Sequence, residues 1–364
     1  MKIVIDARII SSSTGRYVER LLTYLEKIDM TNKYVVLVPS KDKSYWTPIN
    51  PNFSVEISDV PNFSFAEQIQ FKRQLDVLHP DLVHFCMPQQ PVLYRGRKVT
   101  TIHDLSQLRF YNPDKNWLVY RLKQLIGWFV FKYVIRTSDA ILTDSYFSEK
   151  DIVAFSPTAT DKINTIHLSA DRLGTGSSIP YLLPSENFIM YVGQQATHKN
   201  IRRLIEAHQQ LLDSHPDLQL VLVGKINPAT KRIQKFVKDN SFKNVVFTGF
   251  VPDENLAWLY EHCLAYIFPS LAEGFGMPAL EAMQHNAPVV SSNATCLPEV
   301  CGEAALYFDP YNIKQMTETI QTVIDSPDIR KILIAHGKRQ VAKYSWRHMA
   351  EKTHEVYMAT ILNS

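Results

Sequence analysis

Short β-branched runs alternate with helix-length segments along nearly the whole chain, and this alternation restricts the fold more than any other feature. The pattern is typical of βαβ units, in which parallel strands are joined by helical crossovers. The first series of expected strands covers residues 2–6, 34–38, 81–85, 98–102, 140–143 and 163–167. The second covers residues 188–192, 219–223, 244–248, 264–268, 287–291 and 305–308. We therefore predict an α/β protein with two doubly wound parallel sheets.

The chain has 364 residues, which is too long for one compact core and favours two domains. Residues 171–186 are rich in Gly, Ser and Pro, as expected of a linker. We place the first domain at residues 1–172, the linker at 173–186, and the second domain at 187–344. Two such domains would face each other across a cleft, with ligands outside the carboxyl ends of the strands.

The composition excludes several classes of protein. Hydrophobic residues make up 45% of the chain and charged residues 21%, which is ordinary for a globular protein. A net charge of +3 is too small to indicate a nucleic-acid partner. The four cysteines form neither a C-x-x-C pair nor a metal-ligand spacing, so we expect free thiols in a reducing cytosol. The chain opens on an expected strand without a signal peptide, which also favours a cytoplasmic protein.

The most apolar stretch covers residues 117–135, and its interpretation stays open. Arg121, Lys123 and Lys132 interrupt it, which argues against a membrane span. A helix in the core or on a domain surface is the commoner outcome for such a segment. The alternative is peripheral membrane contact, with Trp117, Trp128 and Phe129 as anchors and the basic residues facing lipid headgroups.

Residues 269–284 combine features of an anion-binding loop. Gly274 and Gly276 allow bare backbone to approach a ligand closely. Pro278 suits the first turn of a helix, where its missing N–H would be unpaired anyway. The free N–H groups and the positive end of the helix dipole would then point at a phosphate.

Two acids lie at this loop, with Glu273 inside it and Glu281 expected in the first helical turn. Each alone fits a structural role equally well, but together they could grip hydroxyls on either side of the phosphates of a nucleotide sugar. With the intervening Phe-Gly-Met-Pro run, they resemble the E-x7-E signature of the retaining glycosyltransferases of family 4. That family has the GT-B fold of two Rossmann-like domains. The resemblance spans nearly the whole chain and is strongest over residues 188–310.

The resemblance implies a hexosyltransferase that moves a sugar from a nucleoside diphosphate donor with retention at the anomeric carbon. It assigns Glu273 to hydroxyls of the sugar and Glu281 to hydroxyls of the ribose. Backbone groups expected to bind the diphosphate are those of Gly274, Phe275, Gly276 and Met277. A departing phosphate oxygen would act as base, so no side-chain nucleophile is needed. The family also implies that the terminal segment, residues 345–364, packs back on the first domain, which then comprises residues 1–172 together with 345–364.

A second element resembles the family's Y-V-G…K-N sequence. Gly193 permits a tight exit from the strand before it, and Lys199 would neutralise the diphosphate as a point charge. Many relatives carry an Arg directly after this glycine, whereas Gln194 stands here. We leave open whether Arg202 or Arg203 supplies the missing charge.

The first domain carries two weaker elements. His103 follows an expected strand, and taken alone it is best interpreted as a polar residue whose hydrogen bonds are satisfied within the fold. The resemblance to the family's H-D element instead implies that His103 lies beside a hydroxyl of the donor sugar. Asp6-Ala7-Arg8 and the following Gly15 resemble the start of the mannosyltransferase-like branch. Gly15 would let the first loop approach the leaving phosphate or the acceptor. Relatives often have a second glycine here, where this chain has Ser13.

For the donor the resemblance favours GDP-mannose, with a UDP-sugar as the alternative, and for the acceptor a glycan or a lipid-linked glycan in polysaccharide biosynthesis. No Asp-x-Asp occurs in the chain, and both acids of the main loop have other assignments, so we expect no metal cofactor. A nucleotide-sugar epimerase or hydrolase of the same fold is the main competing function. A nicotinamide oxidoreductase is disfavoured because no G-x-G-x-x-G follows either first strand. An inactive sugar-binding protein is disfavoured by the intact motifs.

Overall fold

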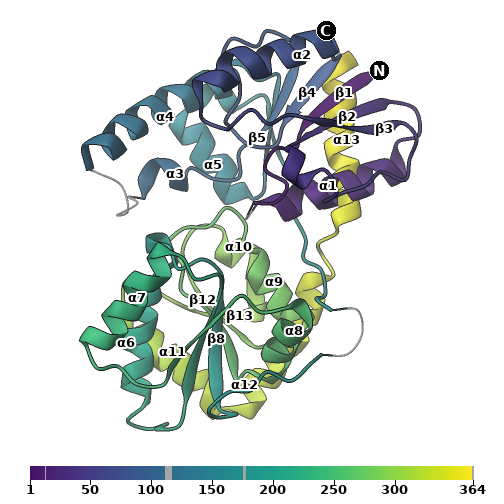
Figure 1. Cartoon of the computed structure of the whole chain (residues 1–364). Coiled ribbons are helices and arrows are strands. Elements are labelled where there is room, and N and C mark those ends of the chain that lie inside the picture. The colour runs from purple at the N-terminus through teal and green to yellow at the C-terminus, as the bar shows by residue number, and fades with distance from the viewer. Residues whose placement is uncertain (13, 111–116, 175–177, 363–364) are drawn as a thin grey trace. The chain divides into compact units, whose positions relative to one another are not determined.

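The computed structural model describes residues 1–12, 14–110, 117–174 and 178–362. The chain divides into two compact units (Figure 1). The first consists of Met1–Leu108, Leu122–Leu168 and Ser345–Ser364, and the second of Arg109–Arg121 and Ser169–Tyr344. Ser13 and residues 175–177 of the expected linker lie outside the described residues.

The first unit contains a seven-stranded parallel sheet with the order β3-β2-β1-β4-β5-β6-β7. Its strands are β1 (Lys2–Asp6), β2 (Lys33–Val38), β3 (Phe53–Ile57), β4 (Leu82–Phe85), β5 (Lys98–Thr101), β6 (Ala140–Thr143) and β7 (Ile163–Thr165). The direction of winding reverses between β1 and β4, which makes the carboxyl ends of these strands the switch point of this sheet.

Helices flank this sheet and bury its two faces. They are α1 (Gly15–Ile28), α2 (Lys72–Leu78), α3 (Ser106–Arg109), α4 (Trp117–Thr137), α5 (Tyr146–Phe155) and α13 (Trp346–Leu362), with short turns η1 (Ser40–Asp42), η2 (Glu67–Phe71) and η3 (Pro157–Ala159). The division between the units crosses both α3 and α4. In β1, Ile3, Val4 and Ile5 are fully buried, as expected for a parallel strand covered on both faces.

Strand β3 was not expected from the sequence. It pairs only with β2 and therefore lies at the edge of the sheet. Most of its side chains are partly or fully exposed, so it lacks the continuous apolar run that marks the central strands. The other strands overlap the expected runs, with ends that differ by one or two residues.

The C-terminal helix α13 packs against α1 of the first unit, and Figure 1 shows it, in yellow, alongside this sheet. Tyr357 of α13 places its hydroxyl 2.5 Å from Nδ1 of the buried His84 on β4. His354 places Nε2 2.9 Å from Oδ2 of Asp29, at the end of α1. The last residues of the chain thereby complete the core of the unit that contains its first residues.

The second unit contains a six-stranded parallel sheet with the order β10-β9-β8-β11-β12-β13. Its strands are β8 (Phe188–Val192), β9 (Gln219–Val223), β10 (Val245–Gly249), β11 (Ala265–Phe268), β12 (Val289–Ser292) and β13 (Ala305–Phe308). Its helices are α6 (Ile201–Leu211), α7 (Pro228–Asp239), α8 (Asp253–His262), α9 (Met277–Gln284), α10 (Leu297–Cys301), α11 (Ile313–Asp325) and α12 (Pro327–Val341), with turns η4 (Thr197–Lys199) and η5 (Gly302–Ala304). The switch point lies between β8 and β11.

None of the helices, as far as their residues are described, is long and apolar enough to cross a membrane.

Candidate active site

The site in the second unit is built at the switch point of its sheet. Strands β8 and β11 pair in parallel there, with Ala265 opposite Ile189. The loops that follow these two strands therefore leave the sheet at the same edge. Leu271 donates its backbone N–H to the carbonyl of His198 at 2.8 Å, which joins the two loops directly. The two sequence elements predicted to bind the donor thus meet at the position where ligands bind in such sheets.

The predicted residues Lys199 and Glu273 form an ion pair. Nζ of Lys199 lies 2.7 Å from Oε1 and 2.8 Å from Oε2 of Glu273. The lysine side chain is 20% exposed and the carboxylate 12%, so the pair is largely shielded while remaining within reach of a ligand. Lys199, predicted to bind phosphate, and Glu273, predicted to bind sugar hydroxyls, therefore lie next to each other.

Asn200, the second residue of the K-N pair, to which the sequence analysis assigned no role, holds the first of these loops in place. Its buried amide Nδ2 donates to the carbonyls of Pro269 at 3.1 Å and Pro310 at 2.7 Å. Asn200 has a φ of 61°, a left-handed conformation that Asn tolerates better than most residues. Because Lys199 is the preceding residue, this anchor fixes the position of the lysine.

The loop containing Glu273 is held from behind by the segment that follows β12. Thr295 accepts a hydrogen bond from the backbone N–H of Glu273 at 3.2 Å. The thiol of Cys296 lies 3.2 Å from the carbonyl of Glu273 and 3.3 Å from that of Phe275. These contacts fix the backbone on both sides of Gly274, which is one of the groups predicted to bind the donor.

Helix α9 begins at Met277, with Pro278 in its first turn as the sequence predicts. Gly276 precedes it with a φ of 102°, and a Cβ there would lie 2.8 Å from Cδ2 of Leu297. Both the backbone conformation and the crowding demand glycine at this position. The expectation that Glu281 lies in the first turn is wrong, because the helix starts early enough to place it one turn further along. There it is buried, with only 6% of its surface exposed.

The two arginines considered as substitutes for the charge missing at Gln194 have other contacts. The Arg202 guanidinium lies 5.0 Å from the ring centre of Phe236. Arg203 donates to Oδ1 of Asn200 at 2.9 Å and lies 5.2 Å from the ring centre of Tyr311. Arg203 therefore supports the anchor of the lysine loop, and its contact with a phosphate stays a prediction.

In the first unit, His103 follows β5 and is paired with a residue that the sequence did not single out. Its Nδ1 lies 2.6 Å from Oδ2 of Asp144, which follows the neighbouring strand β6. Burial alone would lower the pKa of His103, but the charge and hydrogen bond of Asp144, with the charge of Asp104, raise it above the ordinary value. Tyr17 packs edge-on against the imidazole, with ring centres 5.0 Å apart.

Glycine is required at position 15 by the packing of the loop itself. A Cβ at this position would lie 1.8 Å from the carbonyl oxygen of Ile10, so only glycine allows the loop before α1 to close on itself. Its contact with a leaving phosphate or an acceptor stays a prediction. The loop leads directly into α1, which carries Tyr17 to the side of His103.

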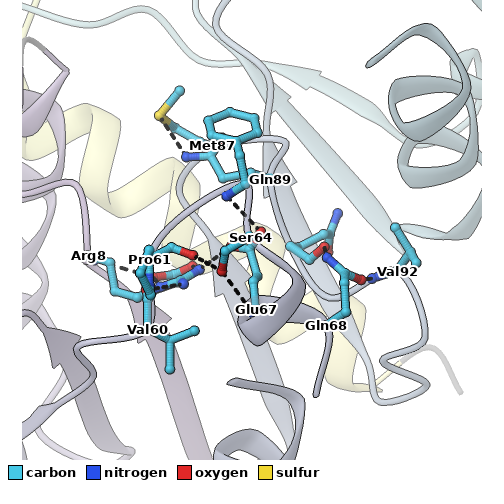
Figure 2. Close-up of polar contacts among 12 residues, drawn as sticks. Arg8, Val60, Pro61, Ser64, Glu67, Gln68, Met87, Gln89 and Val92 are labelled. Atoms are coloured by element: carbon cyan, nitrogen blue, oxygen red, sulfur yellow. Dashed lines mark hydrogen bonds and ion pairs between the residues drawn. The ribbon is translucent and has the colours of Figure 1, made fainter. Parts of the chain in front are cut away.

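Arg8 of the Asp6-Ala7-Arg8 element lies in a buried ionic cluster, and Figure 2 shows it beside Val60 and Glu67. One guanidinium nitrogen of Arg8 lies 2.7 Å from Asp6 and 2.8 Å from Glu67. Another donates to the carbonyl of Val60 at 3.0 Å, and the group stacks on Phe71 with 3.6 Å to the ring centre. The element therefore ties the end of β1 to the segment between β3 and α2.

Comparisons with known proteins agree with this geometry. The sequence pattern described as "Glycosyl transferases group 1" matches residues 181–340. O-antigen chain mannosyltransferase B of Escherichia coli is 32% identical over 273 residues, which cover 72% of this chain and 70% of that protein. The chain belongs to the group 1 glycosyltransferases.

Other members and neighbours of this family extend the comparison. Serotype-specific mannosyltransferase WbdA of Escherichia coli is 29% identical over 304 residues, covering 79% of this glycosyltransferase but 36% of WbdA. Sucrose-phosphate synthase of Thermosynechococcus elongatus superimposes with a TM-score of 0.79 at 18% identity, covering 100% of this chain and 99% of that one. The predicted GT-B fold and glycosyltransferase activity of family 4 are therefore confirmed.

Proposed function

We propose that this glycosyltransferase moves mannose from GDP-mannose, with retention at the anomeric carbon, to a glycan or lipid-linked acceptor in polysaccharide biosynthesis. The observation that carries the proposal is the Lys199–Glu273 pair at the switch point of the second unit, immediately before the start of α9. The choice of mannose is supported by the relatives reported above, whose names describe mannosyltransferases.

The reaction breaks the bond between the anomeric carbon and the diphosphate and forms a bond from that carbon to the acceptor oxygen. Negative charge grows on the departing diphosphate, where Lys199 and the backbone amides at the start of α9 stabilise it. An ammonium has three N–H donors, so Lys199 can bind a phosphate oxygen while still donating to Glu273. The acceptor hydroxyl passes its proton to a departing phosphate oxygen, which balances the step.

The two acids have separate roles in this proposal. Glu273, oriented by its contact with Lys199, binds hydroxyls of the sugar. Glu281, buried in the second turn of α9, binds hydroxyls of the ribose. His103 of the first unit donates to a hydroxyl of the donor sugar.

The test is transfer by the purified protein from a panel of GDP- and UDP-sugars, with and without a mannose-containing glycan as acceptor. We expect GDP-mannose to give an acceptor-dependent product whose new linkage has the anomeric configuration of the donor. Transfer from several UDP-sugars but not from GDP-mannose would overturn the choice of donor. Epimerisation or hydrolysis that is indifferent to the acceptor would overturn the proposed reaction.

We further propose that helix α4 holds the enzyme at the cytoplasmic surface of a membrane that contains anionic lipids. Its exposed side chains include Trp117, Leu125, Trp128 and Phe129. Basic residues are interleaved with them: Arg121 lies 5.6 Å from the ring centre of Trp117, and Lys132 lies 4.1 Å from that of Trp128. No acidic residue occurs between Trp117 and Thr137. Apolar anchors among basic groups suit a headgroup interface. The side of the membrane is supported by the four buried free thiols, which suit the reducing cytosol.

Sedimentation with vesicles tests this contact separately from catalysis. We expect binding to vesicles of mixed phosphatidylglycerol and phosphatidylcholine, and little binding to phosphatidylcholine alone. The Trp128→Ser, Phe129→Ser double variant should lower the partition coefficient at least about tenfold, since each buried aromatic contributes more than 1 kcal/mol. The control is Ile332→Ser, an exposed apolar position on α12. Equal binding by all three proteins would contradict the proposal.

A further inference from the structure

His103 and Asp144 are brought together by the order of the strands. Strands β5 and β6 are parallel neighbours, with Thr101 opposite Leu142, and each of the two residues lies just beyond the end of its strand. Nδ1 of His103 lies 2.6 Å from Oδ2 of Asp144, whose side chain is 5% exposed. A carboxylate in this position accepts the Nδ1 proton and fixes the tautomer of the ring.

The other nitrogen of the ring has no strong partner. The backbone carbonyl of Cys86, beyond β4, interacts with the ring as an acceptor, but buried Nε2 makes no hydrogen bond of ordinary geometry among the described residues. The ring itself is held from the side by Tyr17, whose hydroxyl lies 2.9 Å from Oγ1 of Thr101. An imidazole that is fixed by Asp144 and Tyr17 and lacks a strong partner at Nε2 is preorganised for a substrate atom.

The charged and titratable groups around His103 favour its cationic form. Asp144 beyond β6 and the adjacent Asp104 both favour the charged ring, and so does the backbone carbonyl of Cys86 beyond β4. His84 on β4 opposes it, but burial, with a smaller effect of His103, lowers the pKa of His84 to about 3, so it is neutral. Burial raises the pKa of Tyr17 on α1, which therefore stays neutral too.

We propose that Asp144 is the positioning residue of His103: it fixes the ring with Nδ1–H toward the carboxylate and favours the form in which Nε2–H donates to a hydroxyl oxygen of the donor sugar. This inference rests on the proposed function for the identity of the ligand. The pairing of the two side chains does not depend on it.

The kinetic test is the pH dependence of kcat/KM for transfer. Activity that needs the cation falls as pH rises through the pKa of His103. Asp144→Asn removes the neighbouring charge and should move this alkaline limb to lower pH by about one unit or more. In Asp144→Glu, the alkaline limb should return most of the way to its wild-type pH. Asp104→Asn removes a charge but no hydrogen bond to the ring, so it should move the limb by less than Asp144→Asn does. A merely structural role for Asp144 would lower activity equally at all pH values, and an alkaline limb that Asp144→Asn leaves in place overturns the proposal.

A second measurement needs no donor. Titration of histidine-labelled protein by NMR, with the signal of His103 assigned from the His103→Gln variant, should give a pKa above the ordinary value that falls in Asp144→Asn. An unchanged titration in that variant overturns the proposal. If the wild type transferred no sugar from any nucleotide, the proposed function would fail, while the titration would still decide whether Asp144 controls the charge of His103.

Discussion

Lys199 lies within hydrogen-bonding distance of both carboxylate oxygens of Glu273, at 2.7 and 2.8 Å. These residues are 74 positions apart in the sequence and come from the loops after two neighbouring strands. In the proposed function, Lys199 binds the phosphate and Glu273 the sugar hydroxyls, so the pair would couple the two halves of the donor. Lys199 would then orient the acid, and Glu273 would hold the lysine at the diphosphate.

Substitution of either partner should therefore lower turnover, and the two effects should not add. We expect Lys199→Ala to reduce kcat about 10²–10³-fold, as for loss of one group that stabilises a developing anion. Glu273→Gln should lose turnover while it still binds the free nucleoside diphosphate. A double variant that is no worse than the poorer single variant would show the coupling. Full additivity in this cycle would mean that the pair acts as two independent groups.

Glu281 should affect donor affinity rather than the chemical step. A carboxylate that binds hydroxyls contributes about 1.5–3 kcal/mol, so Glu281→Ala should weaken nucleoside diphosphate binding roughly tenfold to a hundredfold. Calorimetry with GDP measures this directly. A folded variant that binds GDP as tightly as the wild type would exclude Glu281 from the nucleotide site.

Asn200 should matter for stability as well as for catalysis. Asn200→Ala leaves the carbonyls of Pro269 and Pro310 without their donor, at a cost of about 1–3 kcal/mol for each. Asn255→Ala is a matched control, because that amide also donates to two carbonyls, those of Ile179 and Pro180, but at the surface. Urea denaturation should show a clear loss for the first variant and a small one for the second. Equal losses would mean that Asn200 is not a buried anchor.

Most of the architecture was predictable because parallel strands buried on both faces leave a strong apolar signal. β3 lacks this apolar signal because it is an edge strand whose side chains are mostly exposed or half-buried. The loop residues Lys199, Glu273 and His103 could be singled out because each follows a strand and matches a family element. Asp144 could not be singled out, and Asn200 matched the family's K-N pair without an assigned role. Their roles depend on contacts across 41 and at least 69 residues, which only the order of the strands brings about.

His285 should make the second unit less stable in mild acid. Its Nε2 accepts the backbone N–H of Leu173 at 2.9 Å and its Nδ1 lies 3.1 Å from Glu261, so the ring is needed in its neutral form. Burial lowers the pKa of His285, with Glu261 opposing it. A depressed pKa means that this stability is present above the ordinary value of histidine and is lost as pH falls through and below it. His285→Gln keeps an acceptor that does not titrate, so its Tm should fall less than that of the wild type between pH 7 and pH 5. The exposed His348→Gln serves as control, and a parallel fall in all three proteins would contradict the assignment.

Charge at the diphosphate decides whether the enzyme needs a metal. The departing group carries roughly two to three negative charges, and many enzymes balance them with Mg²⁺ held by closely spaced acids. Among the described residues, no group of three His, Cys, Asp or Glu side chains could hold a metal ion. At the main loop, Glu273 is paired with Lys199, and the proposed function uses that lysine and the amides before α9 as the positive groups. We therefore expect the wild type to stay active in the presence of EDTA, and Lys199→Ala to lower turnover at least as much as any acid substitution. Gln194 stands where the family resemblance leads us to expect an arginine, so the site has one expected cation fewer and this is a demanding test. Loss of transfer on chelation, with recovery on addition of Mg²⁺, would overturn the assignment of Lys199 as the chief cation.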